Sequence, residues 1–186
     1  MRLPEECKIE GADYEHLESI FQLVLSSYAG LLGLDSFEPI IKYDREAYGP
    51  HYKFLSLENL RSWFRSGGRE QVFVAVCGDS VIGVVIFGVM GGGEGYVEEI
   101  HVSPEYRGKG IGAALLRSAE RALTSRGVGR VLLEAHEGAI GFFEKMGYKV
   151  LAEVGLYMGK LRYYLLEKVI SPSHAPRATE TGKAIQ

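Results

Sequence analysis

Hydrophobic and polar positions in the first third of the chain predict a strand, a helix and then an irregular stretch. Residues 7–9 are typical of a short strand, and the apolar positions of residues 14–28 recur with the helical period. Asp13 precedes that helix and is expected to cap it. Residues 29–52 mix glycine, proline and aromatic residues without a clear period, so the next expected helix runs from Ser56 to Phe64.

The middle of the chain predicts three consecutive strands. Residues 70–77 and 81–90 are rich in Val, Ile and Phe, and the Gly78-Asp79-Ser80 link between them is typical of a tight hairpin. Residues 96–102 form a third strand, which Pro104 ends because proline cannot donate a hydrogen bond to a central ladder. We therefore expect an antiparallel meander.

The last third of the chain alternates between helical and extended patterns. Residues 111–127 carry one apolar stripe and end in a glycine that suits a helix C-terminus. Residues 131–135 are almost all apolar, as in a parallel strand covered on both faces. A short helix at residues 139–146 and two strands, at 150–157 and 161–169, complete the pattern.

The fold class that follows is α/β in its α+β form, with a mixed, mostly antiparallel central sheet flanked by helices. Residues 1–170 fit a single domain, since domains commonly have about 100 to 150 residues. Residues 171–186 show no apolar period and are expected to form a flexible C-terminal tail.

Charge and composition narrow the function classes. The 186 residues carry a formal net charge of -3 with a pI near 6.0, so they lack the basic field that nucleic-acid binding usually needs. The longest apolar stretch, Val81 to Met90, is too short to cross a bilayer of about 30 Å as a helix. The acidic N-terminus does not resemble a secretory signal. We expect neither nucleic acid nor a membrane as a partner, and we expect a cytoplasmic location.

Cysteine usage gives no sign of a metal centre. Cys7 and Cys77 are the only cysteines, and they show no CxxC spacing. Neither a disulfide framework nor a zinc site is indicated. We expect two buried, reduced thiols, since free cysteine is often buried, and no metal.

The segment Arg107-Gly108-Lys109-Gly110-Ile111-Gly112 lies between the end of a predicted strand and the first turn of a predicted helix. Unpaired amide groups point outward at such a place, and the helix dipole favours an anion. The glycines let the backbone approach phosphate oxygens closely, while Arg107 and Lys109 add positive charge. A phosphate group is the expected ligand.

Two other phosphate-binding motifs compete for this segment. A P-loop needs four residues between its glycines, so the spacing does not fit. Gly108-x-Gly110-x-x-Ala113 does match the dinucleotide fingerprint, and Glu134 ends the next strand about where a ribose-binding acid lies. However, residues 103–107 separate the strand from the first glycine and a meander precedes the loop, which makes dinucleotide binding the weaker alternative.

The same loop, preceded by Val102-Ser-Pro-Glu-Tyr, resembles the acetyl-CoA signature Arg/Gln-x-x-Gly-x-Gly/Ala of the GNAT superfamily of N-acetyltransferases. Residues 139–148 are similar to the family's second motif, which ends in Tyr-Glu-Lys-Leu-Gly-Phe. The resemblance covers residues 7–169. It implies a sheet that is splayed between its fourth and fifth strands, with the pantetheine arm of acetyl-CoA held between them.

Carried over residue by residue, the resemblance implies a set of contacts with the cofactor. The fourth strand would pair with pantetheine through its backbone, and the amide of Val102 would face the thioester carbonyl and stabilise the oxyanion. The residues implied to bind acetyl-CoA are Ile100, His101, Val102, Arg107, Gly108, Lys109, Gly110, Ile111, Gly112, Ala113, His136 and Phe143.

An amine attacks a thioester only when it is unprotonated. A lysine-like amine has a pKa of about 10.4 and is mostly charged at neutral pH, so a base is useful. Tyr96-Val97-Glu98-Glu99 resembles the Tyr-Leu-Glu-Asp stretch of polyamine-type acetyltransferases, which makes Glu98 the first choice. Strand alternation places Glu99, beside His101, on the other face. Glu134 is a third candidate, since Leu133-Glu134-Ala135 resembles the fifth strand of ribosomal-protein N-terminal acetyltransferases.

Two residues depart from the family pattern. Phe143 stands where many relatives place a tyrosine that protonates the departing thiolate. Tyr157, Tyr163 or Tyr164 could take that role, or the thiolate could leave with little help. His136 stands where relatives often have an asparagine that binds pantetheine, and it could substitute as a donor.

The sequence thus predicts an acyltransferase, an acetyl-CoA-dependent N-acetyltransferase that acetylates a primary amine by direct attack. The acceptor could be a protein N-terminus or lysine, a polyamine or another small amine, and a homodimer is possible. Residues 29–52 and the hairpin near 157–164 are expected to roof the substrate cleft. A catalytically silent acyl-CoA-binding regulatory module is the alternative; Phe143 favours it, and the retained Glu98 and Glu99 argue against it.

Overall fold

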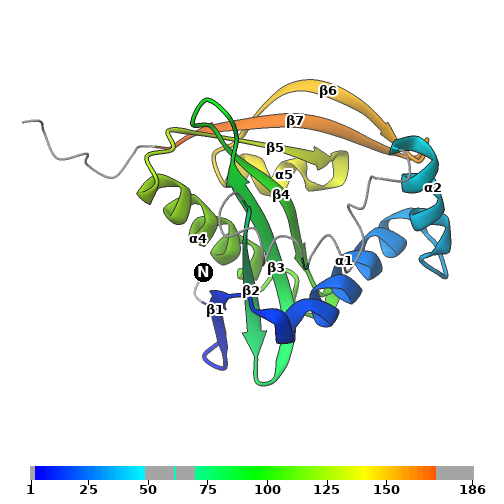
Figure 1. Ribbon diagram of the computed structural model, residues 1–186, viewed down its shortest axis with the longest axis horizontal. Coiled ribbons are helices and arrows are strands. Elements are labelled where there is room, and N and C mark those ends of the chain that lie inside the picture. Colours follow the sequence, from blue (N-terminus) through cyan, green and yellow to red (C-terminus); the bar gives the residue numbers. More distant parts are fainter. Residues whose placement is uncertain (1–2, 49–60, 62–69, 171–186) are drawn as a thin grey trace, which may run out of the picture.

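The computed structural model describes residues 3–48, 61 and 70–170. Within these residues, seven strands form one sheet in the order β1-β2-β3-β4-β5-β7-β6 (Figure 1). The strands are β1 (Cys7–Gly11), β2 (Glu70–Cys77), β3 (Ser80–Val89), β4 (Gly95–Val102), β5 (Arg130–His136), β6 (Lys149–Tyr157) and β7 (Leu161–Val169). The α-helices are α1 (Leu17–Leu32), α2 (Glu38–Tyr48), α4 (Ile111–Ser125) and α5 (Ile140–Lys145).

The topology is the mixed, mostly antiparallel sheet that the sequence predicts. β2, β3 and β4 pair in succession as an antiparallel meander, and β7 lies between β5 and β6. β4 and β5 are the only parallel neighbours among the described strands. A dinucleotide-binding sheet is built from successive parallel strand-helix-strand units, so this topology contradicts the dinucleotide alternative.

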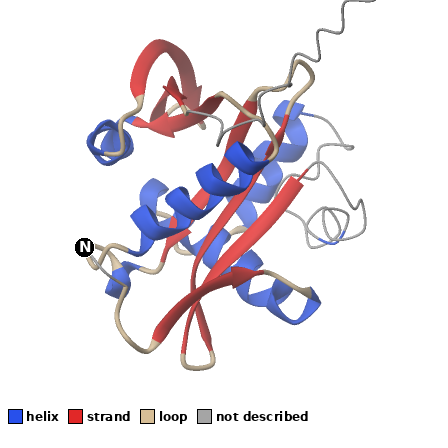
Figure 2. Ribbon diagram, turned by 90° about the vertical axis from the view of Figure 1, so that its left-hand side faces the viewer, coloured by secondary structure: helices blue, strands red, loops and turns tan. Residues whose placement is uncertain are grey.

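Helices cover both faces of the sheet (Figure 2). α4 and α5 pack on one face, in a core that includes the fully buried Leu115, and α1 packs on the other through Ile20. α4 lies very close to the strands, because a Cβ atom added at Gly83 or Gly95 would stand 2.9 Å from a leucine methyl of the helix. These glycines set the depth at which α4 sits, and with it the position of the loop that precedes the helix.

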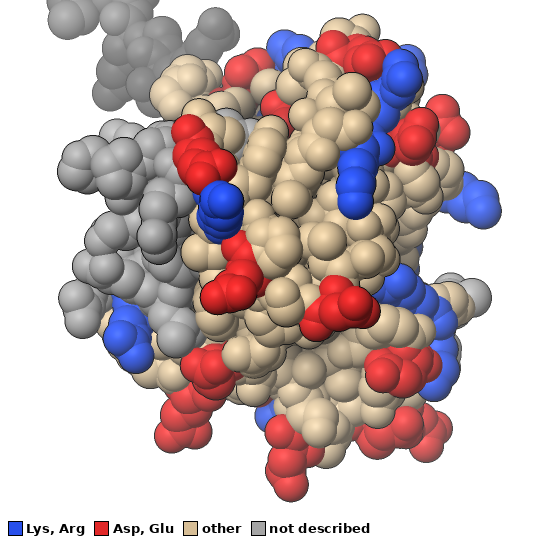
Figure 3. Space-filling view, turned by 90° about the vertical axis from the view of Figure 1, so that its right-hand side faces the viewer, with Lys and Arg blue, Asp and Glu red and all other residues tan. Residues whose placement is uncertain are grey.

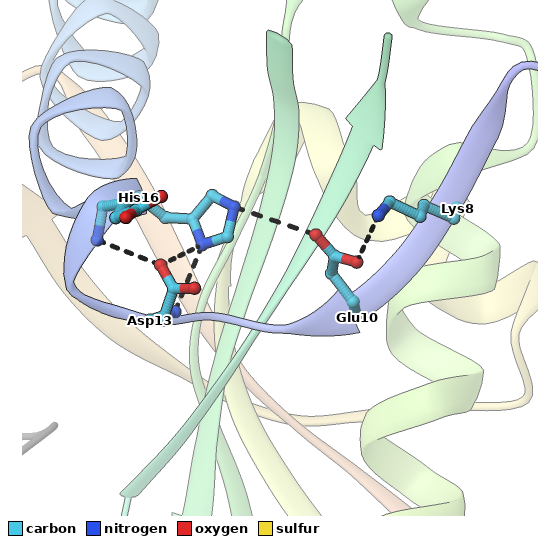
Figure 4. Close-up of polar contacts among 5 residues, drawn as sticks. Lys8, Glu10, Asp13 and His16 are labelled. Carbon is cyan, nitrogen blue, oxygen red and sulfur yellow. Dashed lines mark hydrogen bonds and ion pairs between the residues drawn. The ribbon is translucent and has the colours of Figure 1, made fainter. Parts of the chain in front are cut away.

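The start of the first helical region is held by its own polar residues (Figure 4). The side chain of Asp13 accepts a hydrogen bond from the amide of Glu15 at 3.0 Å, and the amide of Asp13 donates to Nδ1 of His16 at 3.2 Å. Asp13 and His16 make a reciprocal capping box, each side chain pairing with the backbone of the other residue. The predicted cap at Asp13 is confirmed, although one short 3-10 turn, Tyr14–His16, comes before α1.

Two features of the N-terminal half differ from the prediction. α1 continues to Leu32, where Gly33 ends it in a left-handed conformation with φ +65°, and α2 occupies part of the stretch that shows no clear period. Pro39 in the first turn of α2 is well suited to start a helix, but the helix contains few apolar residues, so little hydrophobic pattern marks it in the sequence. Of the helix expected at residues 56–64, the structure describes only Arg61, and the expected tail at 171–186 lies outside the described residues.

No helix in the described part of the chain is both long enough and apolar enough to cross a membrane.

The other predicted elements of the C-terminal half are confirmed within a few residues. Gly127, with φ +80°, follows the end of α4, and Gly147, with φ +90°, follows α5. Both glycines adopt the left-handed conformation that commonly ends a helix.

The expectation of two reduced thiols is wrong in this structure. Cys7 and Cys77 stand opposite each other on the antiparallel strands β1 and β2, with Cα atoms 4.1 Å apart, and form a disulfide. Their separation of 70 residues in the sequence hides this juxtaposition. Strand pairing alone brings them together, so no local spacing motif could have indicated the bond.

The sheet opens between β4 and β5. Their parallel pairing ends at Val97 and Leu133, although β4 continues to Val102. The register of β4 against β3 shifts between Val97 and Glu99, which leaves Glu98 as an extra residue in a β-bulge. The predicted splay between these strands is therefore confirmed, and the bulge lies where the splay begins.

Candidate active site

A cavity of about 1140 Å³ occupies the opening between β4 and β5. It extends from the loop before α4 to the region where α1 and α2 approach the ends of β6 and β7. Figure 3 views the molecule from the side on which α2 and those strand ends lie, where acidic and basic side chains are both scattered over a broad uncharged surface. Of the residues predicted for the site, all but Lys109 line the cavity: Glu98, Glu99, Ile100, His101, Val102, Arg107, Gly108, Gly110, Ile111, Gly112, Ala113, Glu134, His136 and Phe143.

The loop before α4 presents the start of that helix to the cavity. Gly108 and Gly110 have φ values of +74° and +86°, a conformation that residues with a side chain rarely adopt. Gly110 occupies the N-cap position, and no side chain of the described residues caps the helix there. The first turn also contains no acidic residue. The first amide groups of α4 and its dipole therefore remain suited to an anion.

Positive side chains stand beside this helix start. Nε of Arg107 donates a hydrogen bond to the carbonyl oxygen of Val102 at 3.0 Å, which ties the loop to the end of β4. Nζ of Lys109 lies 4.8 Å from the centre of the Tyr106 ring, and the side chain is exposed. Lys109 can thus add positive potential at the rim without lining the cavity itself.

A buried carboxylate stands further along β4. Glu99 has only 6% of its surface exposed. Its Oε1 accepts a hydrogen bond from the hydroxyl of Tyr28 at 2.9 Å, and its Oε2 pairs with Nε2 of His101. The rings of Tyr28 and His101 are 5.5 Å apart. Burial, and then the neighbouring carboxylate, raise the pKa of Tyr28 well above its ordinary value, so Tyr28 stays protonated and holds Glu99 in place as a donor.

A second buried carboxylate, Asp44, comes from α2. Its Oδ1 accepts a hydrogen bond from the hydroxyl of Tyr157 at 2.8 Å. Burial raises the pKa of Asp44, while the bond from Tyr157 lowers it and the charge of Glu99 raises it. Asp44, Tyr28 and Tyr157 all line the cavity, and the two tyrosine rings are 5.7 Å apart. This end of the cavity is thus acidic and aromatic.

The other two candidate bases have a different setting. Glu98 and Glu134 line the cavity but are exposed. Because of the bulge at Glu98, the simple alternation assumed for β4 does not hold: Val97 and Ile100 both pack against the core on the α4 face, three residues apart. Glu99 and His101 then share the opposite face, toward α1.

The two residues that depart from the family pattern have different surroundings. Phe143 is 4% exposed, packs edge to face against Phe142 and Tyr148 in the core, and lines the cavity. Burial, followed by the nearby His101, lowers the pKa of His136. His136 is therefore neutral near pH 7, and one of its ring nitrogens can donate a hydrogen bond.

Of the tyrosines considered as proton donors, Tyr157 and Tyr163 line the cavity. Tyr164 packs against the core on the α4 face. Among the described residues no cluster of three or more His, Cys, Asp or Glu side chains could hold a metal ion.

Sequence reasoning missed Tyr28 and Asp44. Tyr28 lies near the end of an amphipathic helix, where an aromatic residue fits ordinary packing, and Asp44 lies in the stretch without a clear period. Tyr28 and Glu99 are 71 positions apart in the sequence, and Asp44 and Tyr157 are 113 apart. No local motif connects residues at such separations.

Comparisons with known proteins agree with this geometry. The model of the acetyltransferase (GNAT) family matches residues 37–148, more than half of the chain. The chain therefore belongs to the acetyltransferase (GNAT) family.

Curated relatives share shorter segments. The chain is 36% identical over 55 residues to a glucosamine 6-phosphate N-acetyltransferase from Trypanosoma brucei brucei, which is 30% of this chain and 37% of that protein. It is 34% identical over 61 residues to the uncharacterized N-acetyltransferase YjcF of Bacillus subtilis, which is 33% of this chain and 44% of that protein. The chain thus spans less than half the length of these two relatives.

Solved structures match over nearly the whole fold. The PaiA N-acetyltransferase from Thermoplasma acidophilum, in complex with coenzyme A, matches with a TM-score of 0.71 and 23% identity, over 88% of this chain and 99% of that chain. A ribosomal-protein-alanine N-acetyltransferase from Brucella melitensis matches with a TM-score of 0.64 and 18% identity, over 88% of this chain and 99% of that chain. At these identities the structures show a shared fold.

Proposed function

We propose that this protein transfers the acetyl group of acetyl-CoA to a primary amine by direct attack. The observation that carries the proposal is that one cavity joins an uncapped, glycine-rich helix start to a buried carboxylate, across the gap between β4 and β5. The first feature suits a pyrophosphate, the gap suits an extended arm, and the carboxylate suits an amine. The family membership supports the same chemistry.

The donor would lie along the axis of the cavity. Its pyrophosphate would bind the amides of residues 110–113 and the charge of Arg107. The pantetheine arm would pair with the backbone of Ile100 to Val102, whose edge toward β5 is no longer used by that strand. His136, neutral and on the β5 side of the gap, would offer a hydrogen bond to the same arm.

Glu99 is the base that the geometry favours over Glu98 and Glu134. Tyr28 and His101 hold its carboxylate in one position, and a fixed partner contributes more to catalysis than a mobile one. Glu98 and Glu134 are exposed, so water competes for both. The proton of the attacking amine would pass to Glu99, directly or through one water molecule.

The bond changes then follow in order. The amine nitrogen attacks the thioester carbonyl, whose oxygen gains negative charge opposite the amide of Val102. The carbon–sulfur bond breaks, the acetyl group stays on nitrogen, and the sulfur leaves as thiolate. Thiols have a pKa of about 8.5, so the sulfur can leave as thiolate without an acid that protonates it. Phe143 is therefore compatible with turnover.

The acceptor amine is not fixed by the relatives. One curated relative is named for glucosamine 6-phosphate and one structural neighbour for ribosomal-protein alanine, and these are chemically different amines. We propose a small primary amine or a peptide end as the acceptor class.

Release of coenzyme A tests the proposal. With saturating acetyl-CoA and a panel of peptides, polyamines and small amines, at least one amine should accelerate the appearance of free thiol far above the rate of hydrolysis. If no member of the panel does so while acetyl-CoA binds, the silent acyl-CoA-binding module is the correct account. The protein should be the full chain, and the thiol reading should be corrected for its own cysteines.

A further inference from the structure

The acceptor end of the cavity contains more acidity than the transfer reaction requires. Glu99 is sufficient as a base, yet Asp44 on α2 is equally buried, with 6% of its surface exposed. One oxygen of Asp44 is bonded to Tyr157. The other, Oδ2, is buried and has no hydrogen-bond partner among the described residues. A buried carboxylate oxygen without a partner destabilises the folded protein, because it loses its hydrogen bonds to water and forms none within the protein.

The surroundings of Asp44 suit a cation. The ring of Tyr157 lies 5.3 Å from that of Tyr43 and 5.7 Å from that of Tyr28, at angles of 78° and 51°. Rings at these distances and angles contact each other edge to face, and the Tyr28 and Tyr157 rings also line the cavity together with Asp44. An ammonium group close to aromatic faces and a carboxylate is stabilised by both.

Asp44 is also connected to the reaction centre. Tyr157 donates a hydrogen bond to Asp44, and its ring contacts that of Tyr28. Tyr28 in turn donates a hydrogen bond to Glu99. The two carboxylates thus stand at opposite ends of one row of tyrosines along the cavity wall. On the same wall, the hydroxyl of Ser27 on α1 is buried and has no partner among the described residues. Both Ser27 and Asp44 offer an acceptor oxygen to a ligand with N–H groups.

We propose that the acceptor carries a second cationic group, which binds at Asp44 beside Tyr28 and Tyr157 while its reacting amine lies beside Glu99. The ligand class is therefore a compact diamine or a related dication. This inference rests on the proposed function and narrows its acceptor. A monoamine of equal length would leave Asp44 desolvated and unpaired, and sites of that kind discriminate strongly against a ligand that lacks the matching group.

The experiment compares α,ω-diamines with n-alkylamines of matched chain length. In the wild-type protein, kcat/KM for the best diamine should exceed that for its matched monoamine by about 10-fold or more. In Asp44→Asn that ratio should fall toward one. Asp35→Asn removes a carboxylate that is exposed and does not line the cavity, and it should keep the wild-type ratio.

The outcomes separate two failures. If acetyl-CoA is used with neither monoamines nor diamines, nor with any other amine, the proposed function fails. If monoamines are acetylated as well as diamines by the wild-type protein, or if Asp44→Asn keeps the preference, the second cation site is refuted while the transferase stands. Should Asp44→Asn not fold, the wild-type ratio alone decides.

Discussion

Glu99 and Asp44 are two carboxylates buried in one cavity, and a tyrosine from another element holds each of them. Tyr28 on α1 bonds Glu99 on β4, and Tyr157 on β6 bonds Asp44 on α2. Hydrogen bonds from tyrosine are a moderate compensation for lost hydration. Both residues are therefore better explained by what they offer a ligand than by what they add to stability.

Removing the proposed base should reduce the chemical step. Glu99→Gln keeps the shape and should lower kcat by about 100-fold or more, since general bases contribute that much or more. Glu98→Gln changes the neighbouring carboxylate, which sits in the bulge, and should have a much smaller effect. The kcat of both variants should be measured from pH 6 to about 10, with circular dichroism to check the fold. A larger loss in Glu98→Gln would return the base role to Glu98.

Asp44 should make stability depend on pH. Its pKa is raised in the folded protein. Asp44 therefore contributes most to the free energy of unfolding below its unfolded pKa of about 3.9. That contribution is lost as the pH rises through the folded pKa. Asp44→Asn should therefore raise the melting temperature near pH 7 more than it does near about pH 4. Thermal melts of both proteins at the two pH values check this. An equal change at both pH values would show that the pKa of Asp44 is not raised.

The choice between neighbouring glutamates shows where sequence reasoning stops at this scale. Strand alternation separates Glu98 from Glu99, but it cannot say which face the cavity occupies, and it assumes a regular strand. The bulge at Glu98 breaks that regularity. The glycine loop, in contrast, could be predicted, because its chemistry depends on residues that are adjacent in the sequence.

Among the elements, α4 does most to define the site, since its N-terminus faces the cavity and its body rests on two glycines of the sheet. Gly110 at its start and Gly127 after its end both adopt positive φ, +86° and +80°. The two ends of one helix thus offer the same backbone conformation in two different settings. Only one of these ends lies beside the cavity.

Gly110→Ala should weaken donor binding, because it strains the backbone and places a methyl group where phosphate oxygens would approach. We expect the dissociation constant for acetyl-CoA to rise by about 10-fold or more, because the alanine-bearing loop relaxes in the free protein and must regain the left-handed conformation on binding, at a cost of roughly 1–2 kcal/mol. Gly127→Ala has a comparable strain, so it should lower the melting temperature without changing the dissociation constant. Calorimetric titration of both variants measures this. Equal affinity in the two variants would place the donor elsewhere.

The disulfide between β1 and β2 should contribute to stability. It closes a loop with a sequence separation of 70 residues, for which chain entropy gives up to roughly 4 kcal/mol. Reductant should lower the melting temperature of the wild-type protein and leave that of the double variant Cys7→Ser, Cys77→Ser unchanged. Titration of the denatured, unreduced wild type for thiols provides the direct check. Two titratable thiols would contradict the bond.

Most elements could be predicted because their periodicity is strong. α2 is the exception, since it contains few apolar residues and its inner face carries Ile40 together with Tyr43 and Asp44, so little apolar pattern is present in the sequence. The same residues make α2 useful to the cavity. An element chosen for its contacts with a ligand is one whose core pattern is incomplete.

At the scale of the whole molecule, the cavity is assembled from three separate parts of the chain. One part is α1 with α2, the second is β4 with the loop before α4, and the third runs from β5 through α5 to β6 and β7. The family match over residues 37–148 includes β4, the loop before α4, β5 and α5. Tyr28 and Asp44 come from helices in which the sequence showed no motif, and for this reason the acceptor stayed open at the level of sequence.

A cytoplasmic location and a homodimer stay predictions. Disulfides are rare in reducing compartments, so the bond between Cys7 and Cys77 does not favour a cytoplasmic location. The acceptor end of the cavity is complete enough within one chain to hold two carboxylates and their tyrosines. The proposed chemistry therefore needs no second copy.

The most direct test follows the acetyl group itself. Acetyl-CoA labelled in its acetyl carbon should be mixed with the protein and the best amine of the panel, and the product should be identified by mass spectrometry. The account predicts labelled N-acetyl amine in a one-to-one ratio with released coenzyme A, formed much more slowly by Glu99→Gln. Coenzyme A released without labelled amide, or no release at all with acetyl-CoA bound, would contradict it.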